Sequence, residues 1–454
     1  MRKLSSGDSG IEQTARSIAA RLSDRGYLAF FAGGCVRDLL RGEIPKDYDI
    51  ATDARPEEVQ KLFARTYAVG AHFGVIVVLE NDDQFEVATF RSDGVYADGR
   101  RPTEVHFSSA VEDAKRRDFT INGMFFDPAS DAVIDHIGGR ADLDAHLIRA
   151  IGDPAQRFAE DRLRLLRAVR FATVLGFEIE PDTWSALQQS ASSIAAISAE
   201  RIREELVRIF LSRNRARGWD LLDASGLMAA ILPELTAMKG CEQPPQFHPE
   251  GDVFKHTRLM LELLQPEVSI PLVFSVLFHD IGKPLTSSVD ADGRIRFNGH
   301  DRVGAEMTAS IMQRLRFSRA EIDATVEAVR QHMVFKDVPN MRVAKLKRFM
   351  ARPTFSDEHE LHRVDCASSH QMMDNYEFLL TKREEFANEP IIPPPLVGGD
   401  DLIALGLRPG PQFGEILEAA ETRQLEGAFR DRADALAWLK QEYSKFNAEG
   451  ASQA

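Results

Sequence analysis

In the first 150 residues the apolar positions follow two different spacings, which predicts strands and helices mixed in one domain. Short apolar runs, and a run in which apolar and polar residues alternate, are typical of buried strands. The predicted strands are residues 28–32, 74–80 and 84–91, the last two joined as a hairpin. The predicted helices are residues 11–24 and 55–63, the second capped by Thr52 or Asp53. We therefore expect an α+β fold with a mixed sheet.

From Phe158 onward the apolar residues recur at helical spacing, so the rest of the chain is expected to be all-α. One amphipathic helix is predicted over residues 158–175, with a buried stripe of Leu163, Leu166, Val169 and Val174. Prolines near residue 240 indicate a change of domain, and the Pro- and Gly-rich segment 391–399 indicates a linker. The predicted domains are residues 1–150, 151–240, 241–390 and 391–454.

A turn with two glycines follows the first predicted strand. Gly33 and Gly34 let the backbone approach a ligand closely, and the free N–H groups of the helix that follows are a common phosphate site. Asp47 and Asp49 come next in a predicted strand, where alternate residues share a face. Two such carboxylates repel each other unless a divalent cation lies between them. The sequence therefore predicts a phosphate-binding turn beside a metal-binding pair of carboxylates, a combination suited to phosphoryl or nucleotidyl transfer.

Other charged residues near these motifs have two interpretations on sequence alone. Glu86 is either a third carboxylate facing Asp47 and Asp49 or a solvent-facing strand residue. Asp161, Arg164 and Arg167 share a helix face, which is either a solvated ion-paired surface or a set of groups that pairs with base edges. The second reading follows because a carboxylate accepts from an exocyclic amine and a guanidinium donates to ring acceptors. The basic helix 342–352 is a candidate phosphate-binding surface.

Histidines and aspartates are informative in the second half of the chain, where an adjacent His-Asp pair follows an apolar run. The candidate metal ligands are His256, His279, Asp280, His300, His332 and Asp365. Imidazole and carboxylate suit Ni, Mn, Co, Fe, Zn or Mg, and six ligands could hold two ions. Such a metal could activate water against a phosphoester. The alternative is a domain that keeps its fold around a degenerate site.

Composition narrows the class of protein. A net charge of −14 argues against indiscriminate coating of nucleic acid but leaves a local basic groove open. Three widely spaced cysteines predict no disulfide framework and favour a reducing compartment. The first ten residues are polar and no apolar run approaches membrane length, so we expect a cytoplasmic protein with no membrane partner.

The motif G-G-x-V-R-D followed by D-x-D resembles the polymerase-β-like nucleotidyltransferases, and more closely the class II tRNA nucleotidyltransferases and their poly(A) polymerase relatives. The resemblance implies a polymerase-β-like head in which Asp47 and Asp49 hold Mg²⁺. It also implies a nucleotide site made of Gly33, Gly34, Arg37, and, from the motif R-R-D-F-T-x-N, Arg117, Asp118 and Asn122. The segment 92–103 corresponds to a flexible loop that the family needs to add the terminal adenosine.

Glu160-Asp161-x-x-Arg164 matches the family's E-D-x-x-R motif, an amino-acid template for choosing CTP and ATP. The resemblance therefore implies that Asp161, Arg164 and Arg167 bind the nucleotide base in a helical neck and body. It places tRNA contacts and neck packing in the Arg-rich segment 201–217, for which a solvated helix is the alternative.

The order H…H-D…H…H…D resembles the HD phosphohydrolase superfamily. Lys283 stands where the H-D-x-G-K motif of that family carries a phosphate-contacting lysine. An all-α HD domain and a helical tail are therefore implied, the tail resembling the C-terminal module of CCA-adding enzymes that carry an HD domain.

Together these resemblances imply template-independent addition of CCA to tRNA from CTP and ATP, with Mg²⁺ in the head and a divalent transition metal or Mg²⁺ in the HD domain. A monomer and a homodimer both remain open. The nearest alternatives are an A-adding enzyme and a poly(A) polymerase. An HD phosphohydrolase whose N-terminal half only binds RNA, and a pure scaffold, are further alternatives.

Overall fold

The structure is a computed structural model that describes residues 10–70, 74–94, 105–387 and 390–443. The chain divides into two compact units. The first unit is Met1–Ala237 with Gln313–Phe317, and the second is Met238–Met312 with Ser318–Ala454. The four predicted domain boundaries are finer than this division and remain a prediction.

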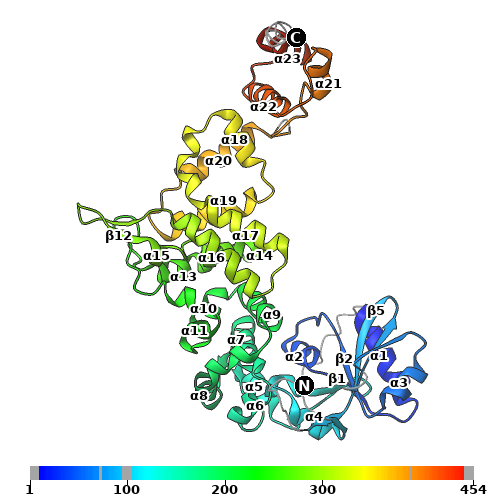
Figure 1. The fold of residues 1–454 in the computed structure, drawn as a ribbon. Helices are drawn as coiled ribbons and strands as arrows, with labels where there is room; N and C mark the ends of the chain where they lie inside the picture. Colours follow the sequence, from blue (N-terminus) through cyan, green and yellow to red (C-terminus); the bar gives the residue numbers. More distant parts are fainter. Residues whose placement is uncertain (1–9, 71–73, 95–104, 388–389, 444–454) are drawn as a thin grey trace. The chain divides into compact units, whose positions relative to one another are not determined.

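A mixed sheet is the core of the head, at the blue end of the chain in Figure 1. Within the described residues it has seven strands in the order β3-β4-β5-β2-β1-β8-β9. The strands are β1 (Ala29–Ala32), β2 (Asp49–Thr52), β3 (Thr66–Gly70), β4 (Val75–Glu80), β5 (Asp83–Thr89), β8 (Phe125–Asp127) and β9 (Ala132–Ile134). β2 and β5 are parallel, and the other neighbours are antiparallel. Since Ala32 pairs with Asp49, the acidic start of β2 lies beside the glycine turn.

Apolar side chains from the sheet and its helices explain why this domain forms. Phe31 in β1 stacks on Phe126 and meets Tyr48 edge to face, with ring centroids 6.0 and 5.1 Å apart. The first helix buries Ile18 and Leu22 at helical spacing. The helices are α1 (Gly10–Ser23), α2 (Gly34–Arg41), α3 (Pro56–Leu62), α4 (Ala110–Arg116) and α5 (Gly139–Asp144). The predicted α+β fold with a β4–β5 hairpin is confirmed.

Two local predictions in the head are corrected. The N-cap of α3 is Arg55, because the carboxylate of Glu58 accepts from the Arg55 N–H at 2.8 Å. Thr52 and Asp53 instead accept from the N–H groups of Ala54 and Leu28. The predicted loop 92–103 begins later than expected, because β6 (Arg91–Asp93) pairs with β7 (Val105–Phe107). Residues 95–103 of that loop lie outside the described residues.

Helices make up most of the rest of the first unit, but residues 158–175 are not one helix. α6 (Pro154–Glu160) ends at Asp161, whose backbone is extended, and α7 (Leu163–Leu175) begins after it. The break forms because the Asp161 carboxylate accepts from the Leu163 N–H at 3.1 Å. Val174 is 45% exposed, since the buried face of α7 continues at Thr173. The remaining elements are β10 (Leu147–Ile148), β11 (Glu178–Ile179), α8 (Pro181–Ser190), η3 (Ala191–Ala196), α9 (Ala199–Phe210), α10 (Arg215–Ala224), α11 (Leu227–Ile231) and α12 (Pro233–Thr236).

The second unit is almost entirely helical, as expected. Its helices are α13 (Val253–Leu263), α14 (Ile270–Phe278), α15 (Lys283–Thr286), most of α16 (His300–Arg314), α17 (Arg319–Gln331), η4 (His332–Asn340), α18 (Val343–Met350), α19 (Phe355–Ser368), α20 (Asp374–Glu385), α21 (Gly399–Ala404), α22 (Gln412–Leu425) and α23 (Arg432–Tyr443). A small hairpin of β12 (Ser287–Val289) and β13 (Ile295–Phe297) is the addition that helical spacing did not predict. None of the described helices is long and apolar enough to cross a membrane.

Two arginines of the basic segment 342–352 form ion pairs with residues of the second unit. Arg348 donates to the carboxylate of Glu421 in α22 at 3.0 Å, and Arg352 pairs with Glu358 in α19. These two guanidinium groups therefore tie α18 and the turn after it to neighbouring helices, which reduces the surface predicted to bind phosphate.

Candidate functional sites

The glycine turn of the head lies against the residues predicted to bind nucleotide and metal. Gly33 has φ +74°, a conformation that favours glycine. A Cβ built on Gly33 would lie 3.3 Å from Nη1 of Arg117 and 3.7 Å from Oδ2 of Asp49. The missing side chain therefore leaves room where the turn, a guanidinium and a carboxylate meet.

Carboxylates at the start of β2 form an electrostatically unfavourable cluster. Burial, together with the negative charges of Glu86 and Asp47, raises the pKa of Asp49 to about 6. Glu86 comes from β5, where the next residue, Val87, pairs with Ile50 in the parallel register. Asp47 precedes β2 rather than lying in it, and its side chain is exposed. A divalent cation would relieve this repulsion, so the residues fit a hard, oxygen-liganded metal ion.

The predicted nucleotide-binding residues form a connected hydrogen-bond network. Arg37 donates to the side-chain oxygen of Asn122 at 2.8 Å, and the Asn122 amide donates to Asp118 at 3.1 Å. Asp118 in turn accepts from Nε of Arg167 at 2.8 Å. Burial would raise the pKa of Asp118, but Arg167 and Asn122 outweigh it and hold this pKa at about 2. The network joins the head to helix α7.

The break between α6 and α7 sets the positions of the E-D-x-x-R residues. Asp161 forms an ion pair with Arg201 of α9 at 3.1 Å. Arg164 is 7% exposed and donates to Glu160 at 2.9 Å and to the Arg116 carbonyl at 3.0 Å. Both side chains are therefore held by ion pairs within the protein rather than by solvent.

A cavity of about 490 Å³ brings these groups together. From the predicted set it is lined by Gly33, Gly34, Arg37, Asp47, Asp49, Arg117, Asp118, Asn122, Asp161, Arg164 and Arg167. Glu86 is not among the lining residues of this cavity, although its charge acts on Asp49. The residues predicted to bind metal and nucleotide therefore line the same cavity as Asp161 and Arg164, which are predicted to bind the base.

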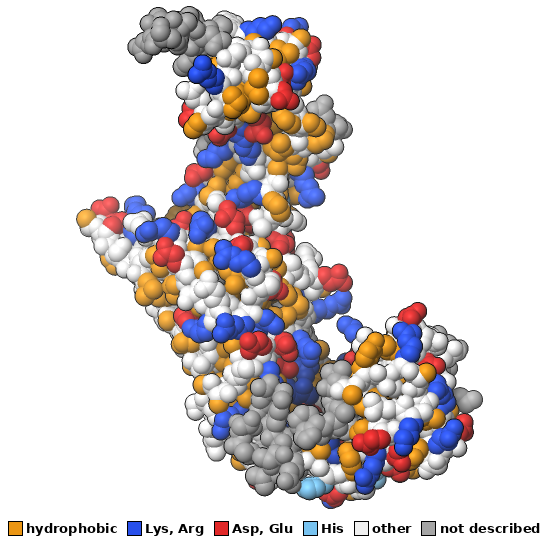
Figure 2. All heavy atoms as spheres, turned by 45° about the vertical axis from the view of Figure 1, so that its right-hand side comes forward, with side chains coloured by type: hydrophobic (Ala, Val, Ile, Leu, Met, Phe, Trp, Pro, Cys, Tyr) orange, Lys and Arg blue, Asp and Glu red, His pale blue; other side chains and the backbone are white. Residues whose placement is uncertain are grey.

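Six lining residues were not predicted for this site: Asp38, Arg116, Arg170, Phe171, Arg201 and Arg208. A signal for Arg170 was present, because it continues the spacing of three that joins Asp161, Arg164 and Arg167. Arg201 and Arg208 lie in the Arg-rich segment that was assigned to tRNA contacts. Arginines outnumber aspartates along the described lining, and Figure 2 shows Lys and Arg side chains gathered at this hollow of the first unit. Such a surface suits a polyphosphate.

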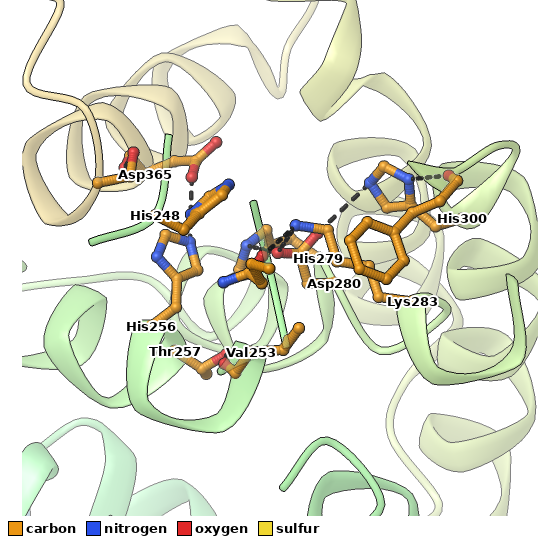
Figure 3. Close-up of polar contacts among 12 residues, drawn as sticks. His248, Val253, His256, Thr257, His279, Asp280, Lys283, His300 and Asp365 are labelled. Atoms are coloured by element: carbon orange, nitrogen blue, oxygen red, sulfur yellow. Dashed lines mark hydrogen bonds and ion pairs between the residues drawn. The ribbon is translucent and has the colours of Figure 1, made fainter. Parts of the chain in front are cut away.

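The histidine cluster of the second unit is assembled from helix ends. His256 lies in α13, His279 caps the end of α14 and is followed by Asp280, and His300 begins α16. His332 begins η4, and Asp365 lies in α19. Figure 3 shows His256, His279, Asp280 and His300 directed toward one another. All six predicted residues are thus in one neighbourhood of the second unit.

Distances within the cluster are those of ligands that share an ion. Nε2 of His256 lies 3.1 Å from Asp365, and Nε2 of His279 lies 3.1 Å from Asp280. Nε2 of His300 lies 3.1 Å from Nε2 of His332. The ligand atoms fall into three groups able to hold an ion, namely His256-His279-Asp280, Asp280-His300-His332 and His248-Glu250-His256. His248 and Glu250 were not predicted, and nothing in their spacing distinguished them.

Burial and charge support a metal in this cluster. The Nε2 atoms of His256 and His279 are buried without a hydrogen-bond partner. Burial, with the imidazoles of His279 and His300, lowers the pKa of His332 to about 4, so this ring is neutral. Burial would raise the pKa of Asp280, but His279 and Lys283 hold it well below its usual range. A neutral imidazole at His332 and an ionised carboxylate at Asp280 are the forms that bind metals, so these two residues fit a divalent ion.

Lys283 lies beside this cluster rather than in open solvent. Its Nζ is 2.7 Å from Asp280 and 2.6 Å from the side-chain oxygen of Gln243. Nε2 of Gln243 is buried without a partner. Lys283 is therefore already paired to the carboxylate of a proposed metal ligand. Its contact with a phosphate remains a prediction.

Three protein-family models match the chain. The poly A polymerase head domain matches residues 29–149, and the HD domain matches residues 253–369. Between them, the model "Probable RNA and SrmB- binding site of polymerase A" matches residues 176–239.

Curated proteins called CCA-adding enzyme are similar to part of the chain. The protein of Geobacillus stearothermophilus is 44% identical over 220 residues, covering 48% of this chain and 54% of that protein. The protein of Bacillus subtilis (strain 168) is 46% identical over 193 residues, covering 42% and 48%. The chain spans about half the length of these relatives in the matched region.

Solved structures match over almost the whole chain. The Bacillus stearothermophilus CCA-adding enzyme in complex with CTP has a TM-score of 0.72 at 26% identity, covering 97% of this chain and all of that one. The Thermotoga maritima CCA-adding enzyme complexed with tRNA has a TM-score of 0.62 at 21% identity, covering 95% of each. The second likeness concerns the fold alone.

Proposed function

We propose that this chain adds CCA to the 3′ end of tRNA from CTP and ATP, a proposal supported by the match of residues 29–149 to the poly A polymerase head domain. One observation carries the proposal: a single cavity holds acidic residues fit for a metal, arginines fit for a triphosphate, and the Asp161–Arg164 pair. The names of the relatives support CCA addition over A-only addition and over poly(A) synthesis. A cytoplasmic location follows from tRNA as the proposed substrate.

Asp47 and Asp49 would hold Mg²⁺ at the start of β2, with Glu86 adding negative charge from the neighbouring strand. When bound, Mg²⁺ lowers the pKa of the tRNA 3′-hydroxyl and neutralises charge on the leaving pyrophosphate. The N–H groups after Gly33 and Gly34, with Arg37 and Arg117, would bind the triphosphate. The hydroxyl would attack the α-phosphate, and the bond to pyrophosphate would break.

Base choice would follow from the chemistry of two side chains. Cytosine and adenine both carry an exocyclic amine beside a ring nitrogen that accepts, whereas uracil and guanine carry a carbonyl beside an N–H. The Asp161 carboxylate would accept from the amine, and the Arg164 guanidinium would donate to the ring nitrogen. In the structure Asp161 is paired with Arg201, and Arg164 is paired with Glu160. A bound base must therefore replace or share these contacts.

The second unit would supply an accessory phosphohydrolase activity. His256, His279, Asp280, His300, His332 and Asp365 would hold a divalent ion, with Ni, Mn, Co, Fe, Zn and Mg as candidates. Such an ion lowers the pKa of a bound water so that it attacks a phosphoester. Lys283 would neutralise the phosphate.

Labelled tRNA transcripts test the main function directly. One transcript ends before CCA, one ends in C-C and one is complete, and each is incubated with Mg²⁺ and CTP, ATP or both. We expect three additions to the first, one to the second and none to the third. Adenosine added only to the C-C transcript would instead identify an A-adding enzyme, and long adenosine tails would identify a poly(A) polymerase. No addition in any reaction would refute nucleotidyl transfer to tRNA.

A further inference from the structure

The second ring nitrogens of the four clustered histidines are all engaged by oxygen atoms. Nδ1 of His279, His300 and His332 lies 3.0, 2.7 and 2.6 Å from the carbonyl oxygen three residues earlier. A donor hydrogen on Nδ1 leaves Nε2 as the free ligand atom. The backbone thus sets the same tautomer in three of the four rings.

His256 is different because its Nδ1 contacts a carboxylate instead of a local carbonyl. It lies inside α13, where the preceding Asp252 carbonyl already accepts from the His256 N–H. Nδ1 lies 2.7 Å from Oε1 of Glu250, while Nε2 faces Asp365. Ser368 Oγ, at 3.3 Å, is a longer contact of the same Nδ1.

Glu250 is held where it meets His256. Its side chain is 5% exposed, and Oε1 also contacts Nδ1 of His248 at 2.9 Å. The His248 and His256 rings meet edge to face, 5.0 Å apart. The Oε2 atom of Glu250 is buried without a hydrogen-bond partner. Burying a carboxylate in this way costs free energy unless a positive charge nearby compensates it.

We infer that Glu250 is a positioning residue of the metal site: its carboxylate fixes the Nδ1–H tautomer of His256 and strengthens Nε2 of that ring as a ligand. Carboxylates behind metal-bound histidines have this effect in other proteins, and removing them typically lowers metal affinity 10–100-fold. His248 holds Glu250 in turn. This inference rests on the metal site proposed for the second unit and is independent of nucleotide addition.

The test is a titration of the metal-free full-length protein with Co²⁺ alone. The visible absorption of Co²⁺ depends on the ligands and their geometry, so binding to the histidine cluster and binding to the carboxylates of the head give different spectra. We expect Glu250→Gln to weaken Co²⁺ binding roughly 10–100-fold, with unchanged stoichiometry and an altered visible spectrum. Glu250→Asp, which keeps the charge, should recover part of the affinity.

Glu242→Gln is the matched control, because it removes the same charge from an exposed residue of the same loop and should bind Co²⁺ like the wild type. Circular dichroism and thermal unfolding of the metal-free variants separate metal binding from misfolding. Equal affinities for wild type and Glu250→Gln would overturn the positioning role. A lower stoichiometry with unchanged affinity would also overturn it, since Glu250 would then be a ligand itself. If the wild type gave no imidazole-type spectrum, the proposed metal site would fail together with the inference.

Discussion

The two candidate metal sites differ in ligand chemistry and in access to solvent. In the head, Asp47 is exposed, Asp49 is half-buried, and both open into an arginine-lined cavity of about 490 Å³. In the second unit His256, His279 and Asp280 are 0, 1 and 2% exposed, and imidazoles outnumber carboxylates among the six proposed ligands.

This difference indicates two ways of using a metal. Oxygen ligands in an open cavity suit Mg²⁺, which keeps several waters and binds through carboxylates together with substrate phosphates. Buried imidazoles with preset tautomers suit a transition metal that stays bound between turnovers. In the head, arginines line the same cavity as the carboxylates, whereas in the second unit Lys283 contacts the carboxylate of Asp280.

The largest expected effect comes from removing a metal-binding carboxylate of the head. Asp47→Ala should reduce nucleotide addition by roughly three orders of magnitude or more, because the metal loses a ligand that neutralises charge in the transition state. Binding of tRNA, measured by filter retention, should change little. Arg208→Ala, in the same cavity, should lower addition far less. Substantial addition by Asp47→Ala would refute the metal assignment.

The next largest effect is expected from removing metal, which should distinguish the two sites by the ion that restores each activity. Dialysis against a chelator should lower hydrolysis of a model phosphodiester about 100-fold, because water is no longer activated. Transition metal should restore hydrolysis, while Mg²⁺ alone should restore nucleotide addition. Metal analysis before and after dialysis checks that the ion has left. Hydrolysis that survives complete removal of metal would contradict the proposed chemistry of the buried cluster.

Much of the fold could be predicted from sequence because strand and helix patterns in this chain are strongly periodic. Residues 28–32 and 74–80 predicted β1 and β4 to within a residue at each end. One failure occurs where a side chain competes with the backbone. Asp161 breaks the predicted helix by accepting from Leu163, and its spacing alone looks helical.

The candidate sites were predictable in their residue types but not in their internal pairing. Motifs located Asp47, Arg164 and the clustered histidines, and the structure brings each set together. Sequence spacing could not indicate that Asp161 would pair with Arg201 of α9, or that Glu250 would approach His256 from a loop. Such contacts depend on how loops and helices pack, which periodicity does not report.

Base selection sharpens the comparison, because it is proposed for the open site of the head and not for the buried site of the second unit. Arg164→Ala should reduce discrimination for CTP and ATP against UTP and GTP roughly 10–100-fold, since a bidentate base contact is worth about 1–3 kcal/mol. The measurement is kcat/KM for each nucleotide. Arg208→Ala is the matched control, because it lies in the cavity outside the E-D-x-x-R motif and should keep selectivity. A variant that is uniformly slow but still selective would show that Arg164 only supports the fold.

The smallest expected effect tests the ion pair that joins the head to α7. Asp118→Asn should lower the free energy of unfolding of the first unit by about 1–2 kcal/mol at pH 7, because Arg167 loses its buried partner. The folded pKa of Asp118, about 2, lies below that of an unfolded aspartate, about 3.9. Stabilisation by the carboxylate is therefore complete above pH 5 and is lost as the pH falls toward 2. Denaturant unfolding of wild type and variant should converge over that range. A difference that stays constant with pH would mean that packing, rather than charge, accounts for the loss.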